Sequence, residues 1–267
     1  MRRNRRQLLQ AGLAASAGAV AGYATNAAAQ ATPKSVVSVA ATYITVAGTS
    51  DLFPVRRIYC IGRNYAAHAR EMGSDPTREP PFFFQKPSDA IQNVAPGSVG
   101  DHPYPTLTKN YHYEVELVAA LSKGGRNIPI DRALELVYGY ALGLDMTRRD
   151  LQRGMGDQKK PWEIGKSFDR SAPIGPIHPL AQLGNGQQHY TKGRIALKVN
   201  GEVKQEADLS YMIWSVAEQI AQLSQAFELK AGDIIYSGTP ENVGPVVKGD
   251  ALVGHIDGLP ELSVRIV

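Results

Sequence analysis

Short apolar stretches, separated by glycine, proline and other turn-forming residues, recur along most of the chain. Several of them alternate apolar and polar positions or are rich in β-branched residues, and both patterns are typical of strands. We expect strands over residues 43–46, 55–61, 82–85, 195–199, 202–205, 233–236 and 262–267, and helices over residues 65–72, 131–137 and 215–225. Because strands outnumber helices and few strand–helix–strand units occur, the pattern favours a mixed α+β fold, predominantly β and largely antiparallel.

Turn-forming and capping residues add local detail to this pattern. The Asn200-Gly201 pair favours a type I′ turn, which would join its two flanking strands into a hairpin. Asn64 is a candidate N-cap for the helix that follows it. The strand over residues 82–85 is expected to be buried, and residues 95–112, rich in Gly, Pro and His, are expected to form a loop.

Two glutamates, Glu114 and Glu116, lie in the apolar run over residues 112–118. Residues two apart on a strand share a face, so their like charges would repel unless a cation lies between them. A third acid, Asp145, ends another apolar run. Three oxygen donors with little soft ligand chemistry nearby suit a hard divalent cation such as Mg²⁺, with Mn²⁺ or Ca²⁺ as alternatives. The competing interpretation is an exposed edge on which the glutamates pair with lysines.

His68 and Glu71 are three apart on an expected helix and would therefore be neighbours on one face. A carboxylate beside an imidazole orients the ring and raises its basicity. The pair is thus a candidate general base for water, and a surface His–Glu pair is the alternative.

Other polar residues stand where an anion could bind. Arg63 and Asn64 follow an expected strand, and Lys166 lies between a glycine and a serine. A lysine near a metal can hold a carboxylate or protonate an enolate, although a solvated lysine is equally compatible with the sequence. The loop over residues 237–245 offers backbone amides and the Thr239 hydroxyl to a carboxylate. It lacks the pattern of a phosphate-binding loop.

The positive charge of the chain is concentrated at its N-terminus. The net charge is +4, but residues 1–31 carry four arginines and no acid, so 25 basic and 25 acidic side chains remain without them. Nucleic-acid binding therefore has no electrostatic support in the remainder.

The same segment has the features of an export signal. Arg5-Arg6, an Ala/Gly-rich apolar stretch and Ala29-Gln-Ala31 together indicate a twin-arginine signal with a cleavage site. The apolar stretch is too short for a membrane span. We expect a signal over residues 1–31, a tether with one strand over residues 32–54, a single domain over residues 55–267, and a periplasmic or exported protein without a membrane anchor. The alternative is a cytoplasmic protein with a frayed basic tail.

Six motifs in unbroken order resemble the fumarylacetoacetate hydrolase family. They are residues 58–68, 86–88, 113–117, 143–150, 165–169 and 237–240, and the similarity spans about residues 43–267. Residues 53–59, 78–84 and 212–215 look most like the fumarylpyruvate hydrolases within this family. The resemblance implies a catalytic domain folded as a mixed β-sandwich roll, usually homodimeric.

The resemblance also implies roles for the candidate residues. Mg²⁺ or Mn²⁺ would be held by Glu114, Glu116 and Asp145, water would be activated by His68 and Glu71, and Lys166 would assist near the metal. We therefore expect a hydrolase of aromatic-compound catabolism that cleaves a C–C bond in acylpyruvate-type diketo acids, for example fumarylpyruvate to fumarate and pyruvate. Candidates for binding this small oxo-acid are Arg63, Asn64, Lys86 and Thr239.

Two alternatives stay open at this point. One is a decarboxylase or keto–enol isomerase of oxaloacetate-like or hydroxymuconate-like acids, because these reactions share a metal-stabilised enolate. The other is an exported dicarboxylate-binding protein. The chain also departs from the family at Asn242, where glycine is usual, and this residue is expected to alter the loop geometry and the substrate fit.

Overall fold

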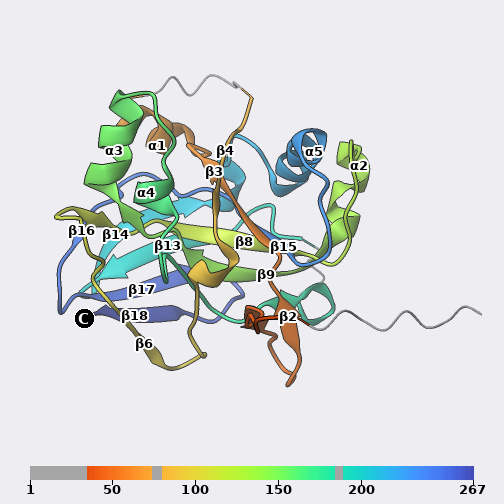
Figure 1. Cartoon of the computed structure of the whole chain (residues 1–267), viewed down its shortest axis with the longest axis horizontal. Helices are drawn as coiled ribbons and strands as arrows, with labels where there is room; N and C mark the ends of the chain where they lie inside the picture. Colours follow the sequence, from red (N-terminus) through yellow and green to blue (C-terminus); the bar gives the residue numbers. More distant parts are fainter. Residues whose placement is uncertain (1–34, 74–79, 184–188) are drawn as a thin grey trace, which may run out of the picture. The chain divides into compact units, whose positions relative to one another are not determined.

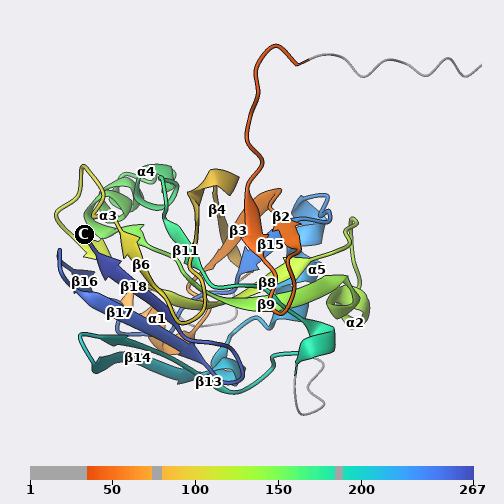
Figure 2. The same ribbon diagram turned by 90° about the horizontal axis from the view of Figure 1, so that it is seen from below.

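The computed structural model describes residues 35–73, 80–183 and 189–267 (Figures 1 and 2). The predicted signal over residues 1–31 lies outside this range. Residues Ala40–Val267 form one compact unit, and the described part of the preceding unit, residues 35–39, contains neither helix nor strand. In the described parts of the chain, no helix is both long and apolar enough to cross a membrane.

Two sheets make up most of this unit. The larger sheet has the order β4-β3-β15-β8-β9-β11-β5, with β12 paired to β9. Its strands are β3 (Arg57–Gly62), β4 (Phe82–Lys86), β5 (Ile91–Asn93), β8 (Val115–Leu121), β9 (Val137–Leu144), β11 (Ala172–Ile174), β12 (His178–Pro179) and β15 (Asp233–Tyr236). The second sheet has the order β14-β13-β17-β18-β6. It consists of β6 (Val99–His102), β13 (Arg194–Val199), β14 (Glu202–Asp208), β17 (Ala251–Ile256) and β18 (Leu262–Ile266).

Smaller elements complete the unit. A two-stranded sheet pairs β1 (Tyr43–Thr45) with β2 (Leu52–Pro54), and β7 (Tyr111–His112) lies between β10 (Thr147–Arg148) and β16 (Pro245–Val246). The helices are α1 (Ala66–Glu71), α2 (Ile130–Ala133), α3 (Arg149–Asp157), α4 (Glu163–Lys166) and α5 (Val216–Ala226). Single 3₁₀ turns occur at Ser88–Ala90, Leu134–Leu136, Leu180–Gln182 and Leu209–Tyr211.

The two large sheets pack face to face, and Figure 2 shows them as separate layers. Leu117 and Leu142 of the larger sheet share one apolar core with Leu197 and Leu252 of the smaller one. The opposite face of the larger sheet forms a second core. This double burial explains why β8 is apolar apart from Glu116 and why every one of its residues is buried. The predicted mixed α+β fold, mostly of strands, is confirmed, and most pairings are antiparallel.

Local signals were reliable where turn or cap chemistry was specific. Asn200 and Gly201 have φ values of 52° and 85°, as a type I′ turn requires, and they join β13 to β14. Ser215 caps α5 and forms a reciprocal capping box with Glu218. The predicted hairpin is confirmed, and the helix predicted over residues 215–225 is found as α5.

Other local predictions were wrong because tertiary contacts decided the outcome. The N-cap of α1 is Tyr65, and the Asn64 amide instead binds the backbone of distant segments. The strand β4 is only partly buried, with Phe82 45% exposed. The expected loop over residues 95–112 contains β6, which pairs in parallel with the distant β18, and also β7.

The strand predicted over residues 43–46 is confirmed as β1, whereas β2 and two helices in the middle of the chain were not predicted. The strands β1 and β2 belong to the same compact unit as the residues that follow them, and their side chains Ile44 and Phe53 are buried in the second core. The helices α3 and α4 lack an apolar stripe because the residues that α3 buries, Arg149 and Gln152, are polar. These two helices pack so closely that a Cβ at Gly165 would lie 2.7 Å from the Cα of Gln152.

Candidate active site

The three predicted acids converge at the ends of two neighbouring strands. Glu114 immediately precedes β8, Glu116 is its second residue, and Asp145 immediately follows β9. The antiparallel pairing of β8 with β9 and a 2.8 Å hydrogen bond from the Asp145 N–H to the Glu114 carbonyl bring them together. All three are buried, and one carboxylate oxygen of each lies within 4.8 Å of the others.

Basic side chains neutralise two of these acids. The Nζ of Lys166 lies 2.8 Å from Oε2 of Glu114 and 2.9 Å from Oδ2 of Asp145. Arg149 pairs with the other oxygen of Glu114, and the Nζ of Lys86 lies 2.8 Å from Oδ1 of Asp145. Burial raises the pKa of Glu114, but Lys166 and Arg149 outweigh it and hold that pKa well below its usual range. Burial lowers the pKa of Lys166, yet Asp145 and Glu114 raise it above its ordinary value, so the ammonium stays charged.

Glu116 is the acid that no basic side chain of the described residues contacts. Its carboxylate accepts a 2.8 Å hydrogen bond from the backbone N–H of Gly238. Only glycine fits at position 238, because the φ of Gly238 is 99° and a Cβ added to it would lie 2.5 Å from the Cβ of Asn64. Burial, Asp145 and Glu114 raise the pKa of Glu116 well above its ordinary value.

The donor set therefore fits a divalent metal. Three buried carboxylates offer hard oxygen ligands within a few ångströms of one another, which is the chemistry that Mg²⁺ and Mn²⁺ prefer. A dication would also offset the repulsion that now falls on Glu116. We conclude that Glu114, Glu116 and Asp145 can hold a divalent metal ion.

His68 and Glu71 form the second part of the site. They lie on α1, with Nδ1 of His68 3.0 Å from Oε2 of Glu71. Burial raises the pKa of Glu71, but the hydrogen bond and charge of His68 and a backbone N–H from Asn242 bring it below the ordinary value. Nε2 of the buried His68 makes no hydrogen bond with another described residue. The pair thus has an ionised carboxylate on one side of the imidazole and a free nitrogen on the other.

Asn242 supports this pair through its backbone. Its N–H donates to Oε2 of Glu71 at 3.1 Å, and its φ is 65°. Asparagine tolerates this left-handed conformation better than most other non-glycine residues.

This conformation predicts the effect of substituting Asn242. Asn242→Val is expected to lower the free energy of unfolding by about 1–2 kcal/mol, because a β-branched side chain opposes the left-handed backbone. Asn242→Gly should stay within about 1 kcal/mol of the wild type, since glycine adopts this conformation readily. Urea unfolding measures both values, and equal losses for the two variants would contradict this account of the loop.

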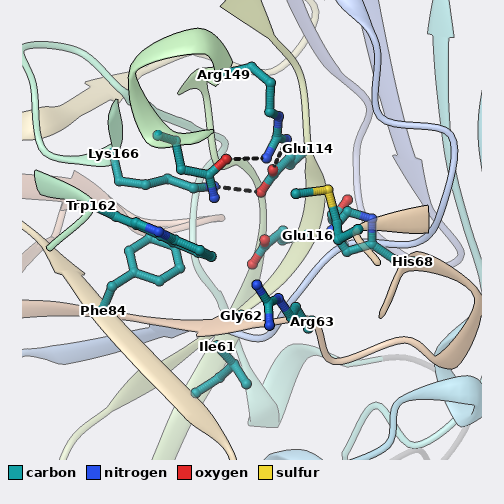
Figure 3. Close-up of a pocket in the computed structure, with 13 residues that line it drawn as sticks. Ile61, Gly62, Arg63, His68, Phe84, Glu114, Glu116, Arg149, Trp162 and Lys166 are labelled. Carbon is teal, nitrogen blue, oxygen red and sulfur yellow. Dashed lines mark hydrogen bonds and ion pairs between the residues drawn. The ribbon is translucent and has the colours of Figure 1, made fainter. Parts of the chain in front are cut away.

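Glu114 and Glu116 of the first cluster and His68 of the second line one cavity, whose empty space is about 310 Å³ including open solvent (Figure 3). Glu71 lines an adjoining cavity. Figure 3 shows Glu114 and Glu116 in the middle, with Lys166 and Arg149 beyond them and His68 to one side. The aromatic side chains of Phe84 and Trp162 form the opposite wall, with ring centroids 5.9 Å apart.

Among the lining residues that sequence reasoning missed are the polar Arg149 and Gln152 and the aromatic Trp162. Arg149 lies inside a family motif, residues 143–150, but its spacing alone gave it no role. One terminal nitrogen of its guanidinium donates to Oε1 of Gln152 at 2.6 Å, and the other donates to the Glu114 carboxylate. Trp162 carried no local signal, because its partners Phe82 and Phe84 come from a distant strand.

The four predicted substrate ligands divide into two groups. Arg63 and Thr239 line the cavity, whereas Asn64 and Lys86 do not. The Asn64 side chain donates to the carbonyls of Trp214 and Ser237, and it accepts from the Trp214 N–H. Lys86 binds Asp145 and the carbonyls of Met146 and Lys166. The polar atoms of Asn64 and Lys86 therefore bind other groups of the protein, and these residues hold the backbone and Asp145 around the site.

Known proteins resemble the chain over most of its length. Fumarylpyruvate hydrolase from a Ralstonia species is 43% identical over 193 residues, which cover 72% of this chain and 95% of that protein. The crystal structure of fumarylpyruvate hydrolase from Pseudomonas aeruginosa, in complex with Mn²⁺ and pyruvate, has 57% sequence identity and a TM-score of 0.84. That match covers 86% of this chain and 97% of the other. The mitochondrial oxaloacetate tautomerase FAHD1 from Homo sapiens is 38% identical over 211 residues, 79% of this chain and 91% of that protein.

The family itself is established by the extent of the match. Residues 57–267 match the family described as fumarylacetoacetate (FAA) hydrolase, C-terminal. This range includes every acid and base of the cavity. The chain therefore belongs to the fumarylacetoacetate hydrolase family.

Proposed function

We propose that this protein is a divalent-metal-dependent hydrolase that cleaves fumarylpyruvate into fumarate and pyruvate. One observation carries the proposal: His68, whose Nδ1 lies 3.0 Å from Glu71, lines the same cavity as Glu114 and Glu116. A site for a divalent metal and a base for water thus face one space. The similarity to two fumarylpyruvate hydrolases, at 43% and 57% identity, supports this substrate.

The acids and the basic side chains beside them form the part of the cavity proposed to bind the 2-oxo acid end of the substrate. A divalent cation bound by Glu114, Glu116 and Asp145 would supply Lewis-acid stabilisation to the oxygens of the 2-oxo acid. Arg149 and Lys166 lie beside these acids and favour negative charge at this end. The hydroxyl of Thr239 donates to the carbonyl of Val115 and positions the loop over residues 237–245 at the same wall.

His68 is the base in the proposed reaction. Its Nε2 takes a proton from water, and Glu71, ionised at neutral pH, stabilises the resulting imidazolium through Nδ1. The water oxygen bonds to the carbonyl carbon of the acyl group, and the C–C bond to the pyruvate portion breaks with its electron pair on the pyruvate carbon. A proton from the Lys166 ammonium completes pyruvate, and the acyl group leaves as fumarate once its new carboxylic acid has released its proton to solvent. Loss of the proton from His68 and uptake of one by Lys166 then restore both side chains.

Removal of the metal tests the proposal directly. Treatment with a chelator is expected to abolish pyruvate release from fumarylpyruvate, and Mg²⁺ or Mn²⁺ should restore it. We propose Mg²⁺ as the working ion, because carboxylate ligands suit it. Mn²⁺ is the alternative, since the crystal structure of the P. aeruginosa relative contains it. Coupled detection of pyruvate measures the rate. Full activity in the chelator would contradict metal dependence.

A tautomerase is the second candidate, favoured by the 38% identity to oxaloacetate tautomerase FAHD1. Product analysis separates the reactions, because hydrolysis yields pyruvate and a second acid whereas tautomerisation leaves the mass unchanged. Conversion of enol-oxaloacetate to its keto form without pyruvate release from any acylpyruvate would favour the tautomerase.

Export and assembly are further proposals. Arg5-Arg6 and the apolar stretch behind it support twin-arginine export to the periplasm. Resemblance to the family supports a homodimer. Cell fractionation tests the first proposal, and light scattering of the purified protein tests the second.

A further inference from the structure

A second, wider cavity adjoins the one that contains the acids. Residues of both cavities include Arg63, Met72, Gln152 and Trp162, and the outer cavity adds a second arginine, Arg153. We infer that Arg63 and Arg153 form a subsite for the distal carboxylate of the acyl group. The inference rests on the proposed function and specifies which acylpyruvates the enzyme prefers: those whose acyl group itself ends in a carboxylate.

The position of Arg63 supports this role. Its guanidinium carbon lies 5.7 Å from the centre of the Trp162 ring, and it makes no ion pair with another described residue. Figure 3 shows its side chain directed into the cavity beside Glu116, at the end away from Arg149 and Lys166. Its φ of 58° lies in the left-handed region, which is unfavourable for arginine and is retained most often at functional positions. The backbone is thus held so that an uncompensated positive charge faces the cavity.

Arg153 extends this charge into the outer cavity. It lies four residues, about one turn, after Arg149 on α3, so the two side chains follow one another along the same side of the helix. Arg149 pairs with Glu114 at the inner end, whereas Arg153 is exposed and has no ion-pair partner among the described residues. Between them, Gln152 lines both cavities. One helix therefore provides a basic group at each end of the path that a substrate would occupy.

Two acids, Glu71 and Asp157, also line the outer cavity, and their negative charges would repel a bound carboxylate. Glu71 is already bound by His68 and by the Asn242 N–H. Asp157 is the exposed last residue of α3 and contacts neither arginine as an ion pair in the described structure. The two guanidinium groups therefore retain free donors. A carboxylate satisfies such donors in a bidentate manner, whereas an uncharged acyl end leaves them to water.

The wall beside Arg63 suits the rest of such an acyl group. Trp162 contacts Phe82 with ring centroids 4.8 Å apart, and Phe84 lies on the same side of the inner cavity. These flat rings would pack against a planar, conjugated acyl chain, while Arg63 lies across the face of Trp162. An apolar wall that ends in free guanidinium groups matches an acyl chain that ends in a carboxylate.

The test compares two substrates in the full-length, metal-loaded enzyme. Fumarylpyruvate carries a distal carboxylate and acetylpyruvate does not, so the ratio of their kcat/KM values measures selectivity for that group. Arg63→Gln and Arg153→Gln are each expected to lower this ratio at least about 10-fold, as loss of a charge-assisted hydrogen bond predicts. Glutamine is chosen because, like arginine, it is unbranched at Cβ and leaves the backbone preference at position 63 nearly unchanged. Arg153→Lys should recover part of the ratio.

Arg265→Gln serves as the matched control, because Arg265 is exposed on β18 and lines neither cavity. It should leave the ratio and the activity unchanged. Equal losses on both substrates, or no loss in the Arg153 variant, would overturn the subsite. If Arg63→Gln does not fold, the exposed Arg153 still decides the question. Failure of the proposed function is distinct, since the wild-type enzyme would then release pyruvate from neither substrate.

Discussion

Replacement of Glu116 by glutamine is expected to abolish pyruvate release and to weaken divalent-metal binding by more than about 100-fold, since changes to second-shell partners of metal ligands already cost 10–100-fold. Glu116 is the acid of the trio that no cation of the described residues neutralises, and it faces the cavity directly. A neutral amide there removes a ligand and a negative charge together.

The same substitution has an opposite effect on the metal-free protein. The pKa of Glu116 is raised by burial and by its two acidic neighbours, so its charge destabilises the fold as pH rises through that pKa. Glu116→Gln removes this repulsion and is expected to match or raise the melting temperature without metal, while abolishing the increase on adding Mn²⁺. Calorimetric titration with Mn²⁺ and thermal melting give the two readouts.

Glu228→Gln is a suitable control, because this residue is exposed and pairs weakly with Lys230 at 3.7 Å. It should behave as the wild type in both measurements. A Glu116→Gln protein that binds Mn²⁺ normally and releases pyruvate at the wild-type rate would exclude the acid trio as the metal site.

His68→Ala is the second change with a large expected effect. It should lower kcat for fumarylpyruvate by about 10²–10⁴-fold, the contribution usual for a positioned general base. Metal affinity should change little, because His68 contacts Glu71 and none of the three acids. Loss of turnover with intact binding separates a base from a ligand.

A matched control for His68→Ala is a histidine that pairs with a carboxylate outside the cavity. His255→Ala provides it, since Nε2 of His255 lies 3.1 Å from Asp257 on the second sheet, away from the cavity. This variant should keep both activity and Mn²⁺ affinity. Hydrolysis at the wild-type rate by His68→Ala would assign the base to another group, and a parallel loss of Mn²⁺ affinity would place His68 in the metal site.

These two experiments also separate the hydrolase from its relatives. An acid trio with a divalent metal suits tautomerases and hydrolases alike, because both reactions pass through an enolate. Hydrolysis needs a base held next to space for water, and His68, oriented by Glu71, is the candidate base that lines this cavity. The Glu116 variant therefore tests the metal site that both reactions need. The His68 variant tests the activation of water, which only hydrolysis needs.

Local spacing was the reliable part of the sequence. Glu114 and Glu116 share a side because they are two apart in extended backbone, and His68 reaches Glu71 because they are three apart on a helix. The hairpin at Asn200 and the cap at Ser215 follow from equally local chemistry. Each of these relations depends on a few consecutive residues and on backbone periodicity.

Relations between distant residues depended on the folded chain. Asn64 looked like a helix cap, but contact with Trp214 and Ser237 engages its amide instead. Lys86 was a candidate substrate ligand, yet it is buried and ion-paired with Asp145. For Asn64, a capping preference worth about 1 kcal/mol is outweighed by hydrogen-bond partners that the fold brings close.

The sequence by itself determined the acids, the histidine–glutamate pair and the predominance of strands, because composition and periodicity act over short distances. Only the tertiary structure decided that Glu114, Glu116 and His68 line one cavity and that Arg63 faces Trp162. It also decided that Arg149 and Lys166 neutralise Glu114, whereas no basic side chain of the described residues pairs with Glu116. The physical reason is that strand pairing and core packing select these long-range neighbours. β8 must pair with β9 before Asp145 can meet Glu114.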